Sequence, residues 1–217
     1  MAWGVKLLND NPLVTRRLRE ALGASFPAAL SANRTPTIEE IVSTLISYLE
    51  ATLEEIHRCG GTTPLVDRQA VVDTQLLGHY VPRGTSVACL TMGPSMMEPG
   101  FHIDESRRHE STRVGQGQKQ KAWNVDDMAV FKPERWIKAD GKFDPAAGPQ
   151  LAFGLGTRAC FGKRLAYLNM RILFILIVWN FELLPCPEKL SEYSSKLIAT
   201  NRPNTCYVRL REIRPSS

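Results

Sequence analysis

The chain has 217 residues, of which 43% are hydrophobic and 23% are charged. This composition is typical of a folded globular protein and excludes disorder, collagen or coiled coil as a description of the whole chain. The excess of Lys and Arg over Asp and Glu gives a net charge of +5. The basic residues are dispersed, so the charge pattern predicts no nucleic-acid partner.

The five cysteines are scattered and form no C-x-x-C pair. This argues against a disulfide framework and a structural zinc site, and it favours a reducing compartment. The longest apolar run, Ile172 to Trp179, has eight residues, whereas a bilayer-spanning helix needs about 20. The sequence therefore predicts no membrane span, and no secretory signal follows Met1.

Two helices are expected in the first 25 residues, because Asn11 and Pro12 interrupt the apolar pattern as an N-cap and a first-turn proline do. A continuous helix is predicted from Thr37 to Arg58. Thr37 and Glu40 match a capping box, and glycines follow Cys59. Its apolar face consists of Val42, Leu45, Ile46, Leu49, Leu53 and Ile56.

The next part of the chain alternates between strand signals and turns. We expect one small hairpin sheet over residues 62–92, with a turn near Leu77 and Gly78, and an exposed loop over residues 104–122. Residues 131–162 are expected to be irregular. A helix is predicted to start at Gly162 and run to about Trp179, so that it takes up residues 163–180. Residues 181–217 are predicted to form terminal strands and loops. The predicted class is α+β, mainly helical.

The most informative segment is residues 153–162, a glycine-rich loop that brings one cysteine to the start of a helix. Gly154 and Gly156 allow positive φ angles and a close approach to a flat ligand. Free N–H groups at the helix start favour a thiolate at Cys160, and Arg158 adds a permanent positive charge beside it. An isolated match of this kind also fits a buried structural cysteine.

All ten positions of this loop together resemble the haem-binding loop of the cytochrome P450 family, in which the cysteine is the axial ligand of the haem iron. The resemblance implies that Cys160 binds the iron of haem b and that Arg158 binds a propionate. It also implies that four further residues shape the cofactor site: Phe153, Gly154, Gly156 and Gly162.

Two upstream segments extend the resemblance. Residues 48–58 resemble the family's E-x-x-R helix, with Glu55 and Arg58 three residues apart, although His57 stands where an aliphatic residue is expected. By itself such a pair is usually a surface ion pair. Residues 131–136 resemble the family's P-E-R-F segment with Trp in place of Phe, which implies that Arg135 joins Glu55 and Arg58 in a buried structural network.

A less specific correspondence concerns Arg68. Residues 64–85 resemble a family stretch in which an Arg or His at this place binds a haem propionate. Arg68 and Arg158 are therefore the expected propionate pair. The alternative for Arg68 is an ordinary surface arginine ahead of a strand.

The resemblance covers nearly the whole chain but only the C-terminal part of the family's fold. We expect the N-terminal half, with its anchor, its substrate-access loops and its oxygen-handling acid-Thr helix, to be missing. Residues 1–8 resemble the end of that helix. A chain lacking the distal wall of the site should have no monooxygenase activity alone.

The implied function is that of a truncated haem-thiolate monooxygenase that inserts one atom of O2 into a small lipophilic substrate, as filamentous-fungal members do in secondary metabolism. Its electrons would come from an NADPH-dependent flavin reductase, with Lys163 and Arg164 as a basic dock or simply as solvated charges. Full-length relatives are usually anchored on the cytoplasmic side of the endoplasmic reticulum. The alternative is a non-catalytic remnant that binds haem or acts as an interaction module.

Overall fold

The structure is a computed structural model that describes residues 1–108, 110, 122–198 and 200–213. Six α-helices lie in these ranges: α1 (Ala2–Asp10), α2 (Pro12–Ser25), α3 (Pro27–Ser31), α4 (Ile38–Ser43), α5 (Ser47–Gly60) and α6 (Lys163–Asn180). Short 3-10 helices lie at η1 (Glu105–Arg107), η3 (Pro133–Trp136), η4 (Gly156–Arg158) and η5 (Glu188–Leu190).

The first two helices meet at Asn11 and Pro12, as predicted, with Pro12 in the first turn of α2. The Asn11 side chain does not cap α2. Its Nδ2 donates instead to the Leu7 carbonyl at 2.8 Å, and Thr15 Oγ1 donates to the Leu8 carbonyl at 2.6 Å. Side chains after the break therefore satisfy carbonyls at the end of α1 that lack helical partners.

The predicted helix over residues 37–58 is wrong in one respect, because it is two helices. The capping box of Thr37 and Glu40 starts α4, but the backbone is extended at Thr44 and α5 begins three residues later. Arg171 of α6 explains the break, since its guanidinium donates to the carbonyls of Ile41, at 2.8 Å, and Thr44. Leu45, expected in the core, is consequently 79% exposed.

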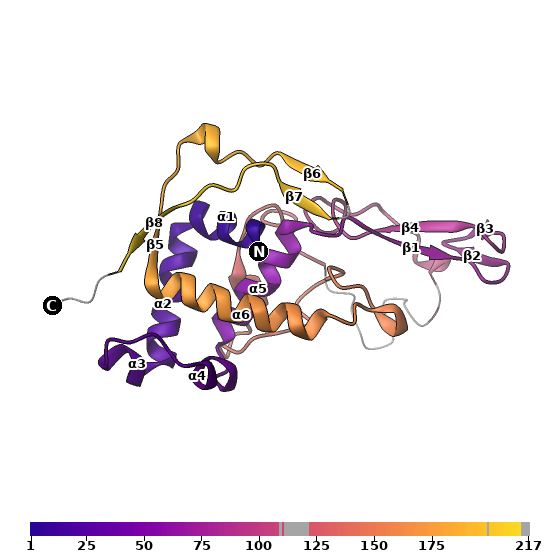
Figure 1. Cartoon of the computed structure of the whole chain (residues 1–217). Helices are drawn as coiled ribbons and strands as arrows, with labels where there is room; N and C mark the ends of the chain where they lie inside the picture. Colours follow the sequence, from indigo (N-terminus) through magenta and orange to yellow (C-terminus); the bar gives the residue numbers. More distant parts are fainter. Residues whose placement is uncertain (109, 111–121, 199, 214–217) are drawn as a thin grey trace.

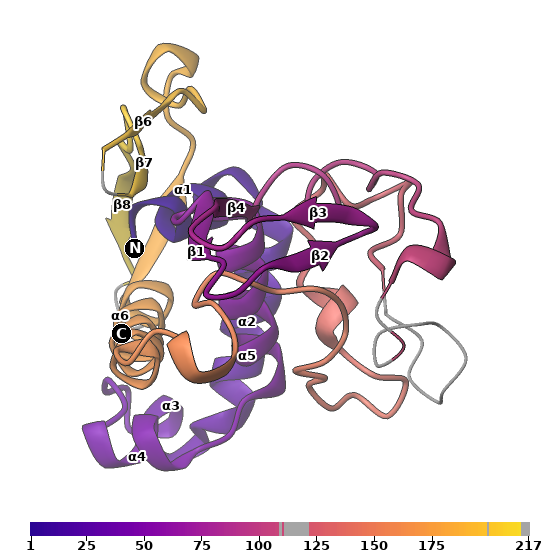
Figure 2. The same cartoon turned by 90° about the vertical axis from the view of Figure 1, so that its right-hand side faces the viewer.

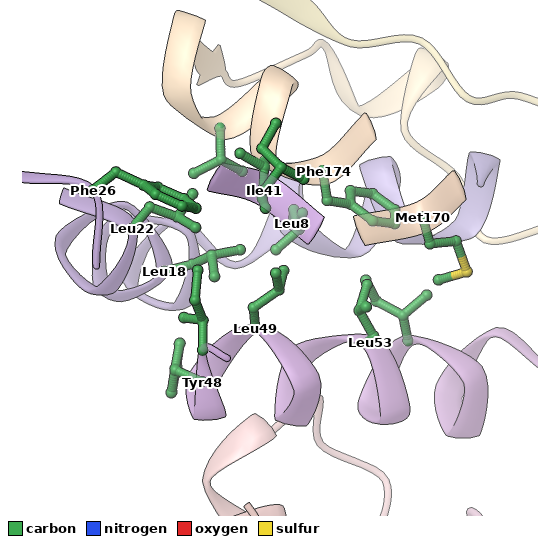
Figure 3. Close-up of a cluster of buried hydrophobic side chains, with 14 of the residues drawn as sticks. Leu8, Leu18, Leu22, Phe26, Ile41, Tyr48, Leu49, Leu53, Met170 and Phe174 are labelled. Atoms are coloured by element: carbon green, nitrogen blue, oxygen red, sulfur yellow. The ribbon is translucent and has the colours of Figure 1, made fainter. Parts of the chain in front are cut away.

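The main core lies between α5 and α6, with α1 and α2 completing it (Figure 3). Leu49 and Leu53 rise from α5, and Phe174 and Met170 descend from α6 toward them. These four side chains are at most 5% exposed. The face of α5 that the sequence predicted to be apolar is therefore buried from Ile46 onward, and it fixes α5 against α6.

The strands form four separate antiparallel pairs in the described chain. Strand β1 (Leu65–Gln69) pairs with β4 (Ser86–Leu90), and β2 (Thr74–Leu76) pairs with β3 (His79–Val81) between them. Residues 62–92 are thus two nested hairpins and not the single sheet expected. The inner turn lies at Leu77 and Gly78, where both φ angles are positive.

The remaining strands tie the end of the chain to the helices. Strand β5 (Phe181–Leu184) pairs with β8 (Arg209–Glu212), and β6 (Ser195–Leu197) pairs with β7 (Asn201–Pro203). In Figure 1 the nested hairpins project from one side of the helices, and β5 and β8 lie on the other. Figure 2 places the coil of residues 122–150 beside the helices. The class is α+β.

The predicted exposed loop at residues 104–122 lies largely outside the described residues, which there include only η1 and its neighbours. Among the described helices, none is long and apolar enough to cross a membrane.

Candidate functional site

The glycine-rich loop folds back on itself. Gly154 and Gly156 both adopt the left-handed backbone conformation, with φ angles of 65° and 69°. Residues other than glycine rarely adopt this conformation. The returning chain closes the loop with a hydrogen bond from Cys160 N to the Phe153 carbonyl at 2.8 Å. The position of Cys160 is therefore set by Phe153, seven residues earlier in the chain.

Cys160 lies just before α6. Its own carbonyl accepts from Lys163 N, the first residue of the helix, at 3.3 Å. The side chain of Cys160 is exposed, and a Cβ at Gly162 would lie 3.8 Å from its Sγ. The thiol thus stands at the positive end of an 18-residue helix.

A cavity of about 490 Å³ opens beside this loop, a volume within the usual range for cofactor pockets. Cys160, Arg158, Phe153 and Gly154 line one part of it. The other lining residues come from α5, from β1 and the residues before it, from α6, from the N terminus and from the residue before Phe153: His57, Thr62, Thr63, Val66, Ala166, Asn169, Met170, Met1 and Ala152.

Arg68 approaches the same loop from β1. A Cβ built on Gly154 would lie 3.9 Å from Arg68 Nη2, so the guanidinium is beside the glycine loop although it is exposed. Arg68 Nη1 donates to the neighbouring Asp67 carbonyl at 2.8 Å. Of the two predicted anion-binding arginines, Arg158 thus lies on the glycine-rich loop and Arg68 lies beside it, on β1.

The predicted network of Glu55, Arg58 and Arg135 is brought together behind the loop. Arg58 donates to both carboxylate oxygens of Glu55, at 2.8 and 2.7 Å, and both side chains are fully buried. Arg135 Nε donates to Glu55 Oε1 at 3.0 Å. A single carboxylate therefore links α5 to η3.

Sequence reasoning missed several partners of this network. Trp136 Nε1 and Lys132 N also donate to Glu55, at 2.9 and 2.8 Å. Asp127 accepts from Arg135 Nη1 at 2.9 Å. Hydrogen bonds from Lys132 and Arg135 hold the pKa of Asp127 below its usual range. The Trp in the P-E-R-W segment was the available signal, because a buried indole N–H needs an acceptor.

Arg58 also binds the chain that follows the hairpins. Its Nη1 donates to the carbonyls of Met96 and Met128 at 2.5 and 2.6 Å, and its Nη2 donates to the Val130 carbonyl at 3.1 Å. The centroid of the Trp123 ring lies 5.5 Å from the guanidinium carbon of Arg58 and 5.5 Å from that of Arg135. The guanidinium of Arg58 thus fixes two irregular segments, one at Met96 and one at residues 128–130, to α5.

His57 lies between this network and the cavity. Its ring centroid is 4.8 Å from Phe153 and 5.1 Å from Tyr167. Its Nε2 is buried and has no hydrogen-bond partner among the described residues. Burial, with smaller contributions from the N-terminal amine and Lys163, lowers the pKa of His57 to about 4. The imidazole is therefore uncharged near neutral pH.

The predicted dock residues Lys163 and Arg164 are both exposed at the start of α6. The Lys163 ammonium lies 6.0 Å from the Phe153 ring and 5.6 Å from the Tyr167 ring. The Tyr167 hydroxyl donates to Glu54 Oε1 at 2.5 Å. Two positive charges thus stand beside the cysteine loop, with one carboxylate nearby.

The arrangement of Cys160, Arg158 and Arg68 around the cavity fits a haem. The exposed Cys160 before α6 supplies a soft sulfur ligand, and the cavity beside it has room for a flat group. The guanidiniums of Arg158, which lines the cavity, and of Arg68, which lies beside the loop, suit carboxylates. The arrangement is that of a haem-thiolate protein. The profile described as Cytochrome P450 matches residues 1–96 and 116–207, so the chain belongs to the cytochrome P450 family. The family implies a haem cofactor.

Two curated relatives of the chain are fungal. The chain is 45% identical to "Cytochrome P450 monooxygenase TRI13" of Fusarium sporotrichioides, over 97% of this chain and 38% of that protein. It is 41% identical to "Hps1-dma1 cluster cytochrome P450 monooxygenase cyp3.1" of Dothistroma septosporum, over 97% of this chain and 71% of that protein. The chain therefore spans well under half of the first relative and about seven tenths of the second.

A solved structure shares the fold. The cytochrome P450DA haem domain superposes with a TM-score of 0.69 and 24% identity, covering 99% of this chain and 40% of that one. At this identity the likeness establishes the fold, which confirms that the helices and small sheets form part of the cytochrome P450 fold.

Proposed function

We propose that the chain carries the thiolate side of a cytochrome P450 monooxygenase site, with Cys160 as the iron ligand. The single observation behind this is the placement of Cys160, which is exposed, lines the cavity and stands before α6. Haem b would be the cofactor. When bound, it supplies the chemistry that activates O2.

The chain's own residues divide the remaining work. Cys160, at the positive end of α6, would supply the sulfur ligand of the iron. Arg158 and Arg68 would bind the two propionates and so fix the rotation of the cofactor. Glu55, Arg58 and Arg135 hold the surrounding segments in place and touch no reacting atom, so we assign them a structural role.

The substrate class rests on the relatives. Two of them are named as cytochrome P450 monooxygenases of fungi, and one belongs to a named cluster. We propose a small lipophilic substrate of fungal secondary metabolism, which receives one atom of O2. Because the chain spans only part of its relatives, this activity is proposed for the whole cytochrome P450 site of which these residues are a part.

The ligand assignment is tested with haem added to the 217-residue chain. Cys160→Ala should abolish the thiolate-type absorption of the reduced carbon monoxide complex. Cys89→Ala, at an exposed cysteine on β4, should keep it. Retention of that absorption in Cys160→Ala would show that another group binds the iron.

The propionate assignment has its own variants. Arg158→Gln combined with Arg68→Gln should weaken haem binding about tenfold or more, since each charged hydrogen bond contributes about 1.5–3 kcal/mol. Arg83→Gln, an exposed arginine of the hairpins, is the matched control. Equal haem affinity of the double variant and the control would contradict this role.

The electron donor is proposed to be an NADPH-dependent flavin reductase that docks at Lys163 and Arg164. Neutralising both as Gln should slow haem reduction and weaken its dependence on salt. Lys196→Gln, on the exposed strand β6, should leave both unchanged. Product formation by the chain completed with the N-terminal half of a related cytochrome P450 distinguishes a monooxygenase from the second candidate, a haem-binding remnant that binds the cofactor without turnover.

A further inference from the structure

His57 lies on α5 together with Glu55 and Arg58, but its side chain lines the cavity and takes no part in the buried network. Its helical neighbours Glu55 and Arg58 bind the irregular segments behind α5, whereas His57 lines the cavity together with Cys160 and Phe153. This side chain therefore belongs to the cofactor side of α5, and none of the roles assigned above uses it.

The ring of His57 is held in an aromatic cluster. Phe153 meets it edge to face, with 4.8 Å between centroids and 75° between planes. Tyr167 completes the cluster, at 5.1 Å from His57 and 5.4 Å from Phe153. Edge-to-face geometry is the favoured arrangement of aromatic pairs and fixes the orientation of both rings.

Phe153 connects this cluster to the cysteine. The Phe153 carbonyl accepts from Cys160 N at 2.8 Å, and this bond closes the glycine-rich loop. The flanking Gly154 and Gly156 contribute no side-chain packing of their own, and a Cβ at Gly156 would meet nothing within 4 Å. The packing of Phe153 against His57 and Tyr167 is therefore the contact that anchors the start of the loop.

The Nε2 atom of His57 lowers the stability of the folded chain relative to an aliphatic side chain at this position. Nε2 is buried without a partner in the described chain, and an unpartnered buried polar atom destabilises the folded state. An aliphatic side chain would fill similar space without that cost. The flat ring of His57 also makes two aromatic contacts, with Phe153 and Tyr167, that an aliphatic side chain cannot make.

We propose that His57 is a positioning residue for the Cys160 loop, acting through its ring contact with Phe153. The flat imidazole orients the Phe153 ring, the Phe153 backbone orients Cys160, and the direction of the thiolate toward the cofactor depends on both. The inference rests on the proposed haem site and deepens it.

The experiment compares His57→Leu, His57→Phe and the control His79→Leu in the full chain with added haem. His79 is exposed on β3. We expect His57→Leu to release haem to a scavenging apoprotein about tenfold faster than the parent, and to shift the absorption of the reduced carbon monoxide complex. The apoprotein of this variant should be as stable as the parent or more so, because the unpartnered nitrogen is gone.

His57→Phe keeps a ring and removes both nitrogens, so it should retain haem and show the parent's absorption. A double-mutant cycle of His57→Leu with Phe153→Leu should be non-additive in the rate of haem loss, because both changes break one contact. His57→Leu carries the test alone if the larger Phe does not fold.

Two outcomes would overturn the proposal. One is parent-like haem loss and absorption in His57→Leu, and the other is haem loss in His57→Phe as fast as in His57→Leu. A parent chain without thiolate-type absorption would overturn the haem site itself, and the inference with it. Parent absorption that Cys160→Ala abolishes and His57→Leu leaves unchanged would overturn only the role of His57.

Discussion

The indole Nε1 of Trp136 donates to Glu55 Oε2 at 2.9 Å, across 81 positions of sequence. The bond occupies an oxygen that Arg58 Nε also contacts, so the carboxylate is shared between a cation and a neutral donor. Trp136 is 0% exposed. This buried bond joins η3 to α5 without adding a charge that must be compensated.

Trp136→Phe should lower the free energy of unfolding by about 1–3 kcal/mol, because it leaves a buried carboxylate oxygen with one donor fewer. Urea unfolding measures the change. Trp179→Phe loses a 3.2 Å bond to the Arg34 carbonyl at an exposed site, and it should cost clearly less. Equal costs for the two variants would contradict a special role for the Glu55 bond.

The neighbouring η3 residues Glu134 and Arg135 form ion pairs that differ in burial, so we expect the loss of each pair to differ in cost. Arg135→Ala removes a buried partner of Glu55 and Asp127 and should cost about 3–5 kcal/mol. Arg17→Ala removes the exposed partner of Glu134 and should cost at most about 1 kcal/mol. Unfolding measurements and the yield of haem-loaded protein should both rank the variants this way. Normal yield of Arg135→Ala with a specific loss of turnover would contradict the structural role.

The sequence predicted elements whose signals are local. The capping box at Thr37, the turn at Leu77 and the helix after Gly162 each depend on a few adjacent residues, and each lies where expected. The resemblance also identified Glu55, Arg58 and Arg135, whose contacts the structure contains.

Long-range contacts were beyond sequence reasoning. The break before α5 depends on Arg171, more than 120 residues away in the chain, and no local feature at Thr44 predicts it. The role of Asp127 likewise appears only when η3 brings Arg135 to it. The cluster of His57 with Phe153 and Tyr167 joins three segments, so the unusual histidine was visible but its partners were not.

Arg171→Met should loosen the junction between α4 and α5. The guanidinium binds the carbonyls of Ile41 and Thr44 and forms an ion pair with Glu50, and Met cannot replace these bonds. We expect faster amide exchange over residues 41–47 and a stability loss of about 2–3 kcal/mol. Arg16→Met, at an exposed arginine of α2, is the control, and unchanged exchange in Arg171→Met would contradict the explanation of the break.

The stability of the apoprotein should depend on His57 in a defined pH range. Burial lowers the pKa of His57 from 6.5 to about 4, so between these values the unfolded chain binds a proton that the folded chain does not. The free energy of unfolding therefore falls as the pH is lowered through this range. The shift corresponds to a loss on the order of 3 kcal/mol.

Other groups around the imidazole titrate or carry charge, so the test is a difference between proteins. Lys163 and the N-terminal amine disfavour the imidazolium, while Glu54, whose pKa is raised by burial, faces Tyr167 in the same cluster. These groups remain in His57→Leu, and only the histidine's proton is removed. Urea unfolding between pH 4 and pH 7 should therefore give a shallower pH dependence for His57→Leu than for the parent, and His79→Leu should follow the parent. Parallel curves for His57→Leu and the parent across this range would mean that the imidazole takes up its proton in the folded chain, and that His57 is not held uncharged behind the Cys160 loop.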